Sequence, residues 1–334
     1  MAQSPIKTVG AREPIAKKLA ISIFFLDNSS KTILIDPNTK CKEAVLLILE
    51  RLMIQKNVNE NSTFANYFGL WESQDGETLQ RRIGNMETLI NAYDQCAKVV
   101  FLVRLYTPEI LSSVDDSISW LLYIQAMHMV AIGSFSLKSI DVERLAALTC
   151  HRRYGPYSET VHTVNFLKNL LLELVPGVDI GKKTPKEWAR NIQISYSSLK
   201  DMESTFRADD GYLCYLEQQK HTSHLYGSWQ FSASQKASRS LPKSIIISVH
   251  AGGIDLLKEG DRSIVLSVPL VQLFAWRADK ENGNLEIDTV PLNDSHAKHY
   301  VLQTEKFSEI AELITDYAQN ALKIVAEKKT KTNE

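Results

Sequence analysis

Two pairs of histidines lie close enough in the sequence to share a metal ion. His221 and His224 are three residues apart, as are His296 and His299. A zinc site takes three or four protein ligands, and neither pair has a third ligand pattern beside it. We therefore interpret all four as solvated loop histidines and expect no metal.

Two pairs of adjacent aspartates, Asp115-Asp116 and Asp209-Asp210, are the candidates for an acid pair. Both pairs come directly before helical patterns. A carboxylate at that position caps the first turn of a helix and interacts favourably with the helix dipole. We therefore expect these aspartates to be N-terminal caps.

Motifs of known catalytic sites are absent from the sequence. It contains no G-x-S-x-G elbow, H-E-x-x-H helix, Walker loop or G-x-G-x-x-G turn. Hydrolase and transferase chemistry needs a nucleophile, a base and an orienting group that converge. The sequence therefore predicts that the chain is not an enzyme and that it needs no cofactor.

Basic pairs are the more informative charged residues. Arg81-Arg82 lies on a predicted strand, and guanidinium groups suit phosphate well. Lys17-Lys18 precedes the first predicted strand and would extend that patch. These pairs predict contact with an anionic lipid headgroup, and the alternative is that they are solvated surface charges.

Two further basic pairs follow predicted helices. Lys328-Lys329 follows the last helix, where a lysine near an anionic membrane contributes about 1 kcal/mol, so we include it among the candidate lipid contacts. Arg152-Arg153 ends a helix in the middle of the chain. Cations at that position interact favourably with the helix dipole, and we expect only that structural role.

The overall composition is that of an ordinary globular protein. The chain has 334 residues, of which 44% are hydrophobic, and 38 Lys and Arg balance 39 Asp and Glu. This length favours two or three domains of roughly 100 residues, and the charge balance argues against a nucleic-acid partner. The four cysteines, without C-x-x-C spacing, fit a reduced, intracellular protein. The most apolar stretch, Ile118 to Ile132, is too short to span a membrane and predicts a buried helix.

The elements that position these residues fall into three segments. In the first, two strands at 19–26 and 31–36 form a hairpin, followed by a helix at 41–56 that Asn38 or Thr39 would cap. Strands at 67–72, 78–83 and 98–105 follow, with a short helical turn at 86–93. This order of elements is that of a ubiquitin-like roll.

The second and third segments differ in type. From 112 to 224 the apolar spacing is helical throughout, which predicts a helical bundle. Seven short strand patterns then precede one amphipathic helix at 305–325, the order of a pleckstrin-homology or phosphotyrosine-binding-type sandwich. An N-terminal arm, 1–17, and a polar tail, 327–334, are too polar to fold alone.

Short motifs in this order resemble those of the FERM domain family. They are Tyr67–Leu70 with Asp75-Gly76, Leu122–Gln125 through Gly133, Leu145–Leu148 with Gly155, Leu225–Ser228 with Phe231, Gly253–Leu257, and Ile310–Tyr317. The resemblance implies an α+β, multi-lobe fold. A ubiquitin-like roll (18–107) would precede an all-α bundle like acyl-CoA-binding proteins (108–224) and a PH/PTB-like sandwich with a C-terminal helix (225–326).

The entry to the third lobe and one of its strands resemble the talin, myosin-tail and kinesin-tail branch more than the ezrin branch. Two segments depart from the family pattern. His128–Ala131 stands where many relatives have an acidic residue before the glycine, and Trp229–Phe231 replaces the usual paired aromatics. These departures concern the subfamily and leave the predicted fold unchanged.

The resemblance also implies a peptide site in the third lobe. In sandwiches of this class an extended peptide adds to a strand edge and lies against the C-terminal helix. Trp276 resembles a tryptophan at the receptor-tail site of the talin branch, although it is as often a core residue, and Phe307, Ile310 and Ile314 fit the buried seam better. The candidate peptide-binding residues are Leu270, Val271, Gln272, Leu273, Phe274, Trp276 and Arg277.

The predicted function is that of a cytoplasmic adaptor at the cell cortex. It would link membrane phosphoinositides and the cytoplasmic tails of receptors or cargo to cytoskeletal proteins. The alternative is a motor-tail type scaffold that binds proteins without lipid. A third alternative, an enzyme that holds acyl-coenzyme A in the helical lobe, rests on fold analogy alone.

Overall fold

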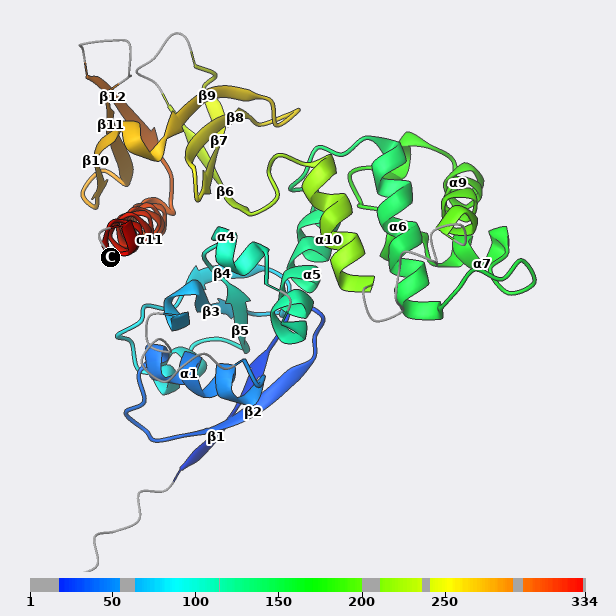
Figure 1. Cartoon of the computed structure of the whole chain (residues 1–334), viewed down its shortest axis with the longest axis horizontal. Helices are drawn as coiled ribbons and strands as arrows, with labels where there is room; N and C mark the ends of the chain where they lie inside the picture. The colour runs from blue at the N-terminus through cyan, green and yellow to red at the C-terminus, as the bar shows by residue number, and fades with distance from the viewer. Residues whose placement is uncertain are drawn as a thin grey trace, which may run out of the picture.

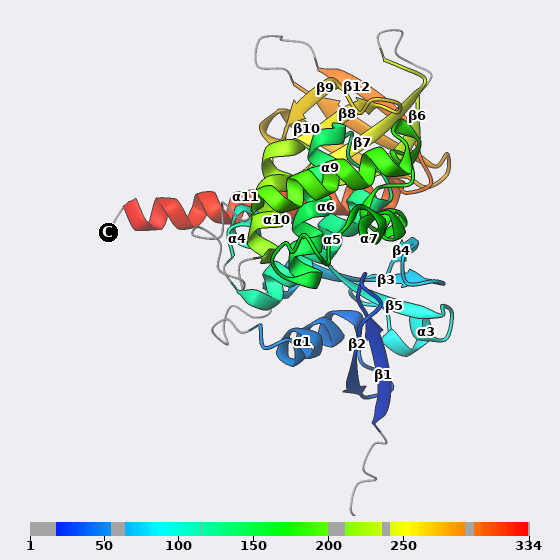
Figure 2. The ribbon, with the colours of Figure 1, turned by 90° about the vertical axis from the view of Figure 1, so that its right-hand side faces the viewer.

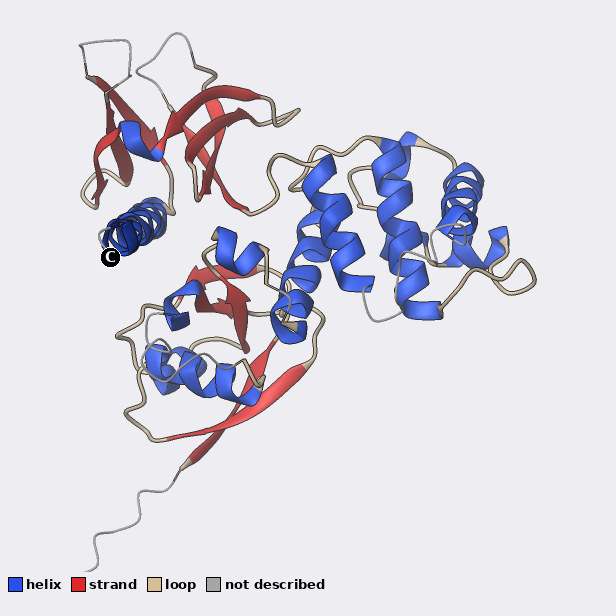
Figure 3. Ribbon diagram, viewed as in Figure 1, coloured by secondary structure: helices blue, strands red, loops and turns tan. Residues whose placement is uncertain are grey.

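A computed structural model describes residues 18–54, 64–113, 115–199, 211–235, 241–290 and 297–332. It contains three lobes, of which the first and third are built on β-sheets and the middle one on helices (Figures 1 and 3). The predicted α+β, multi-lobe fold is confirmed. None of the helices within these ranges is both long and apolar enough to cross a membrane.

The first lobe is a five-stranded sheet in the order β2-β1-β5-β3-β4, with α1 packed on one face. Strands β1 and β5 are parallel and the other pairs are antiparallel. Its elements are β1 (Leu19–Phe24), β2 (Ser30–Ile35), α1 (Cys41–Arg51), η1 (Ala65–Tyr67), β3 (Phe68–Ser73), β4 (Leu79–Arg82), α3 (Leu89–Tyr93) and β5 (Lys98–Val103).

The start of α1 differs from the prediction. Lys40 is the N-cap residue, and its main-chain N–H donates to the Glu43 carboxylate at 2.9 Å. The predicted cap, Thr39, is engaged elsewhere because its hydroxyl accepts a hydrogen bond from Asp36 N. The helix ends at Arg51 instead of Lys56, and residues 55 and 56 lie outside the described ranges.

The middle lobe is helical, as predicted. It contains α4 (Pro108–Leu111), α5 (Asp116–Ala131), α6 (Ser139–Tyr154), α7 (Val164–Asn169), α8 (Leu171–Leu174), η2 (Ile180–Lys182), α9 (Pro185–Ser198) and α10 (Gly211–Thr222). Asp115 caps α5 by accepting from Ile118 N at 3.0 Å, which confirms that prediction, whereas Asp209 and Asp210 lie outside the described ranges. Arg152 and Arg153 end α6, as predicted.

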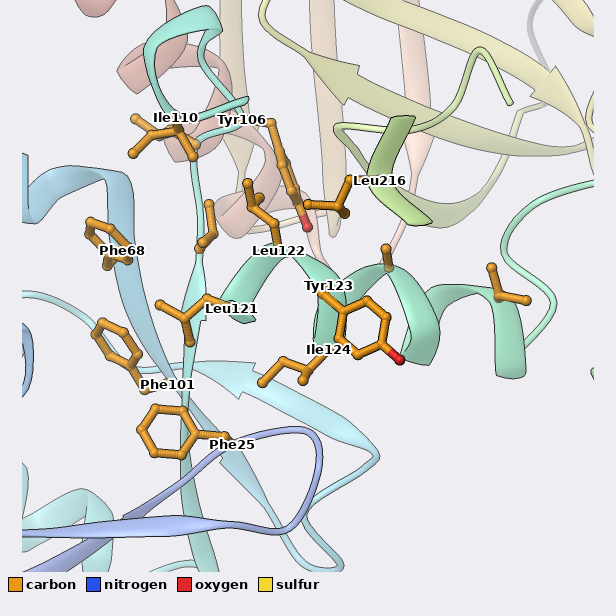
Figure 4. Close-up of a cluster of buried hydrophobic side chains, with 14 of the residues drawn as sticks. Phe25, Phe68, Phe101, Tyr106, Ile110, Leu121, Leu122, Tyr123, Ile124 and Leu216 are labelled. Atoms are coloured by element: carbon orange, nitrogen blue, oxygen red, sulfur yellow. The ribbon is translucent and has the colours of Figure 1, made fainter. Parts of the chain in front are cut away.

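Helix α5 joins the middle lobe to the first. Its apolar residues Leu121 and Ile124 face Phe25 and Phe101 of the first lobe in one buried cluster (Figure 4). The side-chain amide of Gln125 bonds both Val103 N, at 2.7 Å, and Val103 O, at 3.0 Å. The amide thus continues the hydrogen bonding of the β5 main chain, which explains a polar residue within this apolar stretch.

The third lobe is a seven-stranded antiparallel sheet in the order β10-β11-β12-β6-β7-β8-β9, closed by one long helix. Its elements are β6 (Ser228–Ser234), β7 (Ser244–His250), β8 (Gly253–Lys258), β9 (Ile264–Pro269), η5 (Leu270–Gln272), β10 (Leu273–Asp279), β11 (Asn284–Thr289), β12 (Lys298–Gln303) and α11 (Phe307–Thr332). Gly253 has φ +144°, and a Cβ there would lie 2.2 Å from Val268 O, so the β7–β8 turn requires glycine.

Helix α11 is the element that brings the lobes together. It packs on β10, β11 and β7 of its own lobe, and its far end extends away from the rest of the protein (Figure 2). It runs past the predicted end of the helix at residue 325, so residues 327–332, predicted to belong to a polar tail, are helical. Ile310 and Ile314 are buried in its seam, as predicted.

Candidate functional site

A polar stripe on α11 docks onto the first lobe. Glu309, Glu312, Asp316 and Asn320 recur every three or four residues and therefore lie on one side of the helix. Each meets a first-lobe side chain: Glu309 meets Trp71, Glu312 meets Arg82, Asp316 meets Arg104 and Asn320 meets Tyr67. The spacing of these four polar residues is visible in the sequence beside the apolar stripe that predicted the helix.

The two arginines of this interface are buried. The Arg82 side chain is 4% exposed and its Nη1 lies 2.6 Å from Glu312 Oε1, while Arg104 is equally buried and pairs with Asp316. Burial lowers the pKa of Arg104, and the Asp316 carboxylate opposes that shift. These ion pairs hold the first and third lobes together.

Aromatic residues complete the same interface. The rings of Trp71 and Trp229 stack with centroids 5.2 Å apart and an interplanar angle of 16°. The Trp71 indole N–H donates to Glu309 at 3.2 Å, and that of Trp229 donates to Arg104 O at 2.7 Å. Trp229, which departs from the family pattern in the sequence, is thus a docking residue between lobes.

The candidate lipid-binding residues are not brought together. Strand β4, which carries Arg81 and Arg82, is separated from β1 by β5 and β3, and Lys18 lies exposed just before β1. Lys17 lies outside the described residues. Lys328 and Lys329 lie on α11, where the structure does not describe their side chains. The patch predicted from Lys18 and Arg81 is therefore not continuous.

Arg81 differs from its neighbour because it faces solvent. Its side chain is 46% exposed, and it bonds both Glu72 and Glu87. The hydrogen bonds that it donates to the carboxylates of Glu87 and Glu72 raise the pKa of Arg81. An anionic ligand would have to compete with these two carboxylates, and the lipid role of Arg81 and Arg82 stays a prediction.

The candidate peptide site begins later in the chain than predicted. Leu270–Gln272 forms the turn η5, so the strand predicted from Leu270 is wrong in its first three residues. The turn follows Pro269, which has no N–H to continue the β9 ladder. The strand proper, β10, is an edge of the sheet and pairs only with β11 among the described strands.

Apolar side chains stand out from this edge. Val271 is 85% exposed and Phe274 76% exposed. Trp276 is half-buried, and its indole N–H donates to Thr315 Oγ1 on α11 at 2.9 Å, while Arg277 pairs with Glu286 of β11. Trp276 therefore links β10 to α11, and we call the edge between these two elements, with Val271 and Phe274, the β10–α11 groove.

The histidine pairs show no metal site. His221 and His224 are exposed, His296 lies outside the described residues, and His299 Nδ1 lies 2.6 Å from Asp288. No cluster of three or more potential ligands occurs among the residues that the structure describes. Two of the cysteines, Cys41 and Cys150, are buried, and burial raises the pKa of each thiol to about 12, which disfavours the reactive thiolate.

Three comparisons connect this geometry to known proteins. The family model described as the FERM central domain matches residues 109–231. Myosin-VIIa of Drosophila melanogaster is 21% identical over 220 residues, which are 66% of this chain and 10% of that protein. The chain thus spans about a tenth of this curated relative.

Two solved structures show the same arrangement of lobes. The MyTH4-FERM MF2 domain of Dictyostelium discoideum myosin VII superimposes with a TM-score of 0.72 at 16% identity, over 91% of this chain and 59% of that one. The human myosin 7b C-terminal MyTH4-FERM domain, solved with the harmonin-a PDZ3 domain, gives 0.68 at 17% identity, over 91% and 60%.

The predicted resemblance to the FERM domain family is thereby confirmed. The chain has the three-lobed FERM fold, and the model of the FERM central domain matches its middle lobe. The proteins that the chain matches include myosin VII proteins and the FERM domain of Drosophila Merlin. Members of this family are generally adaptors without enzymatic activity.

Proposed function

We propose that this chain is a protein-binding module of the motor-tail type, which holds an extended peptide between β10 and α11. The observation that carries this proposal is the exposure of Val271 and Phe274 beside an open strand edge. An extended peptide added to such an edge gains main-chain hydrogen bonds, and its side chains fill the adjacent apolar groove. The peptide would come from a cargo protein or from a receptor tail.

The cytoskeletal role rests on the relatives. Myosin-VIIa and the myosin 7b domain belong to motor proteins, and the latter was solved with a PDZ domain bound. We extend to this chain only the general role of connecting a protein partner to the cytoskeleton. Placement at the cell cortex belongs to the same proposal.

The test is peptide binding by fluorescence anisotropy. Labelled peptides of the Asn-Pro-x-Tyr class are titrated with the wild-type chain and with the Val271→Ala/Phe274→Ala variant. We expect the affinity of the variant for these peptides to be at least about tenfold lower. A matched control, Leu172→Ala/Ile194→Ala, removes exposed apolar side chains from the middle lobe and should bind normally. Equal affinities for all three proteins would remove the groove from the proposal.

The predicted lipid contact is tested at Arg81 alone, because the double change Arg81→Glu/Arg82→Glu would affect more than lipid binding. Because Arg82 is buried against α11, its replacement would disturb the docking of the lobes and confound the result. Arg81→Glu alone leaves that interface in place. Salt-sensitive flotation with phosphoinositide vesicles that survives Arg81→Glu would exclude this residue as the lipid contact.

A further inference from the structure

A cleft of about 1130 Å³ opens where the three lobes meet. None of the candidate peptide-binding or lipid-binding residues whose side chains the structure describes lines it, so it is distinct from the β10–α11 groove. Its walls come from β3 and β4 of the first lobe, from the end of α5, and from β6, β12 and the start of α11. The apolar part of the lining includes Trp71, Leu79, Met129, Ile132, Trp229, Phe231, Ala233 and Phe307.

One wall of the cleft is an unpaired stretch of strand β6. This strand pairs with β7 along its whole length but with β12 only at Ser234–Gln303. Main-chain groups alternate sides along a strand, and Gln235 N, one residue past β6, bonds Lys243 beside β7. The main-chain groups of Gln230 and Ser232 therefore point away from β7. Among the described residues, their only hydrogen bond on that side is the one that Thr304 Oγ1 donates to Ser232 O.

A second unsatisfied group lies in the same wall. The side-chain amide of Gln230, which lines the cleft, has both its nitrogen and its oxygen buried without a hydrogen-bond partner among the described residues. A buried amide without partners is unusual in a folded protein. An amide offers a donor and an acceptor, which is the complement of a peptide group.

The charge of the cleft is negative. Among the residues that the structure describes, the carboxylates of Glu77, Glu259, Glu305 and Glu309 line it, and Lys306 is the one lysine or arginine in that lining. Lys306 is already engaged, because its ammonium group bonds Gln80 O and lies 3.7 Å from Glu309. Burial lowers the pKa of His128, so this histidine does not offset the carboxylates at neutral pH.

We infer that this cleft binds an extended, basic segment of a partner protein, which adds as a strand along β6. The peptide main chain would satisfy Gln230 and Ser232, and its lysine or arginine side chains would pair with Glu77, Glu259 and Glu305. Phosphoinositides and nucleic acids are the wrong charge for this cleft. The inference goes beyond the β10–α11 groove and holds whether or not that groove is used.

The experiment uses a fluorescein-labelled peptide of about ten residues, long enough for one strand, in which lysine alternates with valine. A glutamate–valine peptide of the same length is the charge control. We expect the wild-type chain to bind the lysine peptide and not the glutamate peptide. Glu77→Gln/Glu305→Gln should weaken binding about tenfold, since each lost pair is charge-assisted.

Three controls separate the cleft from general attraction between opposite charges. Glu50→Gln/Glu159→Gln removes the same charge from exposed positions outside the lining and should bind like wild type. A lysine peptide methylated at alternate main-chain nitrogens keeps its charge but loses the strand hydrogen bonds, and it should bind weakly. Val271→Ala/Phe274→Ala should leave lysine-peptide binding unchanged.

Each outcome decides for or against the cleft. Equal losses in the two Glu→Gln pairs, or full binding of the methylated peptide, would show nonspecific charge attraction and overturn the inference. Loss of binding in Val271→Ala/Phe274→Ala would move the peptide to the β10–α11 groove. If the lysine peptide behaves as expected while Asn-Pro-x-Tyr peptides do not bind, the inference about the cleft is supported and the proposal for the β10–α11 groove is rejected.

Discussion

Two sides of helix α11 face different parts of the molecule. They differ in whether their polar groups are paired and whether the apolar groups near them are covered. The side toward the first lobe carries four polar residues, and each has a partner there. The side toward β10 meets the indole of Trp276, next to apolar side chains that stand in solvent. Polar residues that are paired across an interface belong to the interior of the molecule, while apolar side chains that remain exposed are available to a partner.

The adjacent residues Arg81 and Arg82 show the same contrast on a smaller scale. Both lie on β4 and both are paired with carboxylates. Arg82 is paired across the lobe interface and is buried, whereas Arg81 is paired within its own lobe and is half exposed. Neighbouring residues of a strand point to opposite faces of the sheet, and α11 covers the face that carries Arg82. Strand alternation and the placement of α11 together separate the structural arginine from the accessible one.

The strongest way to break the docked side is Asp316→Ala. This change leaves the buried Arg104 guanidinium without its carboxylate, and loss of one partner of a buried pair costs about 3–5 kcal/mol. We expect a corresponding fall in the urea midpoint of unfolding. The double variant Arg104→Met/Asp316→Leu removes both charges and should recover most of the loss; if it is no more stable than Asp316→Ala, the pair is not what stabilises the interface.

Tyr317 tests the docked side by pH. Burial raises its pKa, against the opposing effect of the Tyr106 N–H that donates to its hydroxyl. A tyrosine in the unfolded chain ionises near pH 10, so the stability contributed by the neutral phenol is complete below about pH 10 and is lost as the pH rises above it.

The variant Tyr317→Phe cannot ionise at this position. Its stability should fall less than that of wild type between about pH 9 and pH 11, measured as the urea midpoint over a pH series. At neutral pH it should be less stable by about 1–3 kcal/mol, because Tyr106 N–H loses its acceptor. Parallel pH profiles for the two proteins would show that Tyr317 does not contribute to alkaline unfolding.

A smaller effect is expected where β10 meets α11. Trp276→Phe removes the hydrogen bond to Thr315 but keeps an aromatic ring in place, and we expect a loss of about 0.5–1.5 kcal/mol. The Thr315 hydroxyl keeps its own bond to Ala311 O. In a double-mutant cycle with Thr315→Ala, strictly additive losses would argue that the indole and the hydroxyl do not interact.

The smallest change in stability is expected on the exposed side. Phe274→Ala removes a side chain that is 76% exposed, so the unfolding free energy should stay within about 0.5 kcal/mol of wild type, while peptide binding falls. A thermal scan and a binding titration on the same sample provide the comparison. A large loss of stability would mean that Phe274 packs in the fold and does not serve a partner.

The sequence predicted the lobes well because each one has its own local pattern. The alternation along β6 to β12 and the helical spacing from Ile118 onward depend on which face of an element is buried, and neighbouring residues reveal that. Asp115 was predicted as a cap for the same reason. Local rules failed at Thr39, where one hydroxyl has two possible main-chain partners and the turn before the helix takes it.

The candidate site was less predictable because it depends on contacts between lobes. Nothing near Arg82 in the sequence indicates that Glu312 will cover it, and nothing near Trp229 indicates that it will stack on Trp71. The cleft at the junction was not predicted at all, since its lining comes from all three lobes. The polar stripe of α11 is the one part of this interface that the sequence does indicate. Its helical spacing is visible in the positions of Glu309, Glu312, Asp316 and Asn320, but it is missed when only apolar residues are searched for a buried face.

Because α11 follows the other elements in the described chain, it is synthesised after the first-lobe surface on which it docks. Its contacts with the first lobe join residues up to 253 positions apart, and at about 5–20 residues per second the ribosome makes the helix on the order of ten seconds or more after the first-lobe sheet. During that interval α11 is not yet present to cover Arg82, Arg104 and the outer face of Trp71. A nascent chain would be open to chaperones at this surface, and a chain stalled before residue 307 would keep it uncovered.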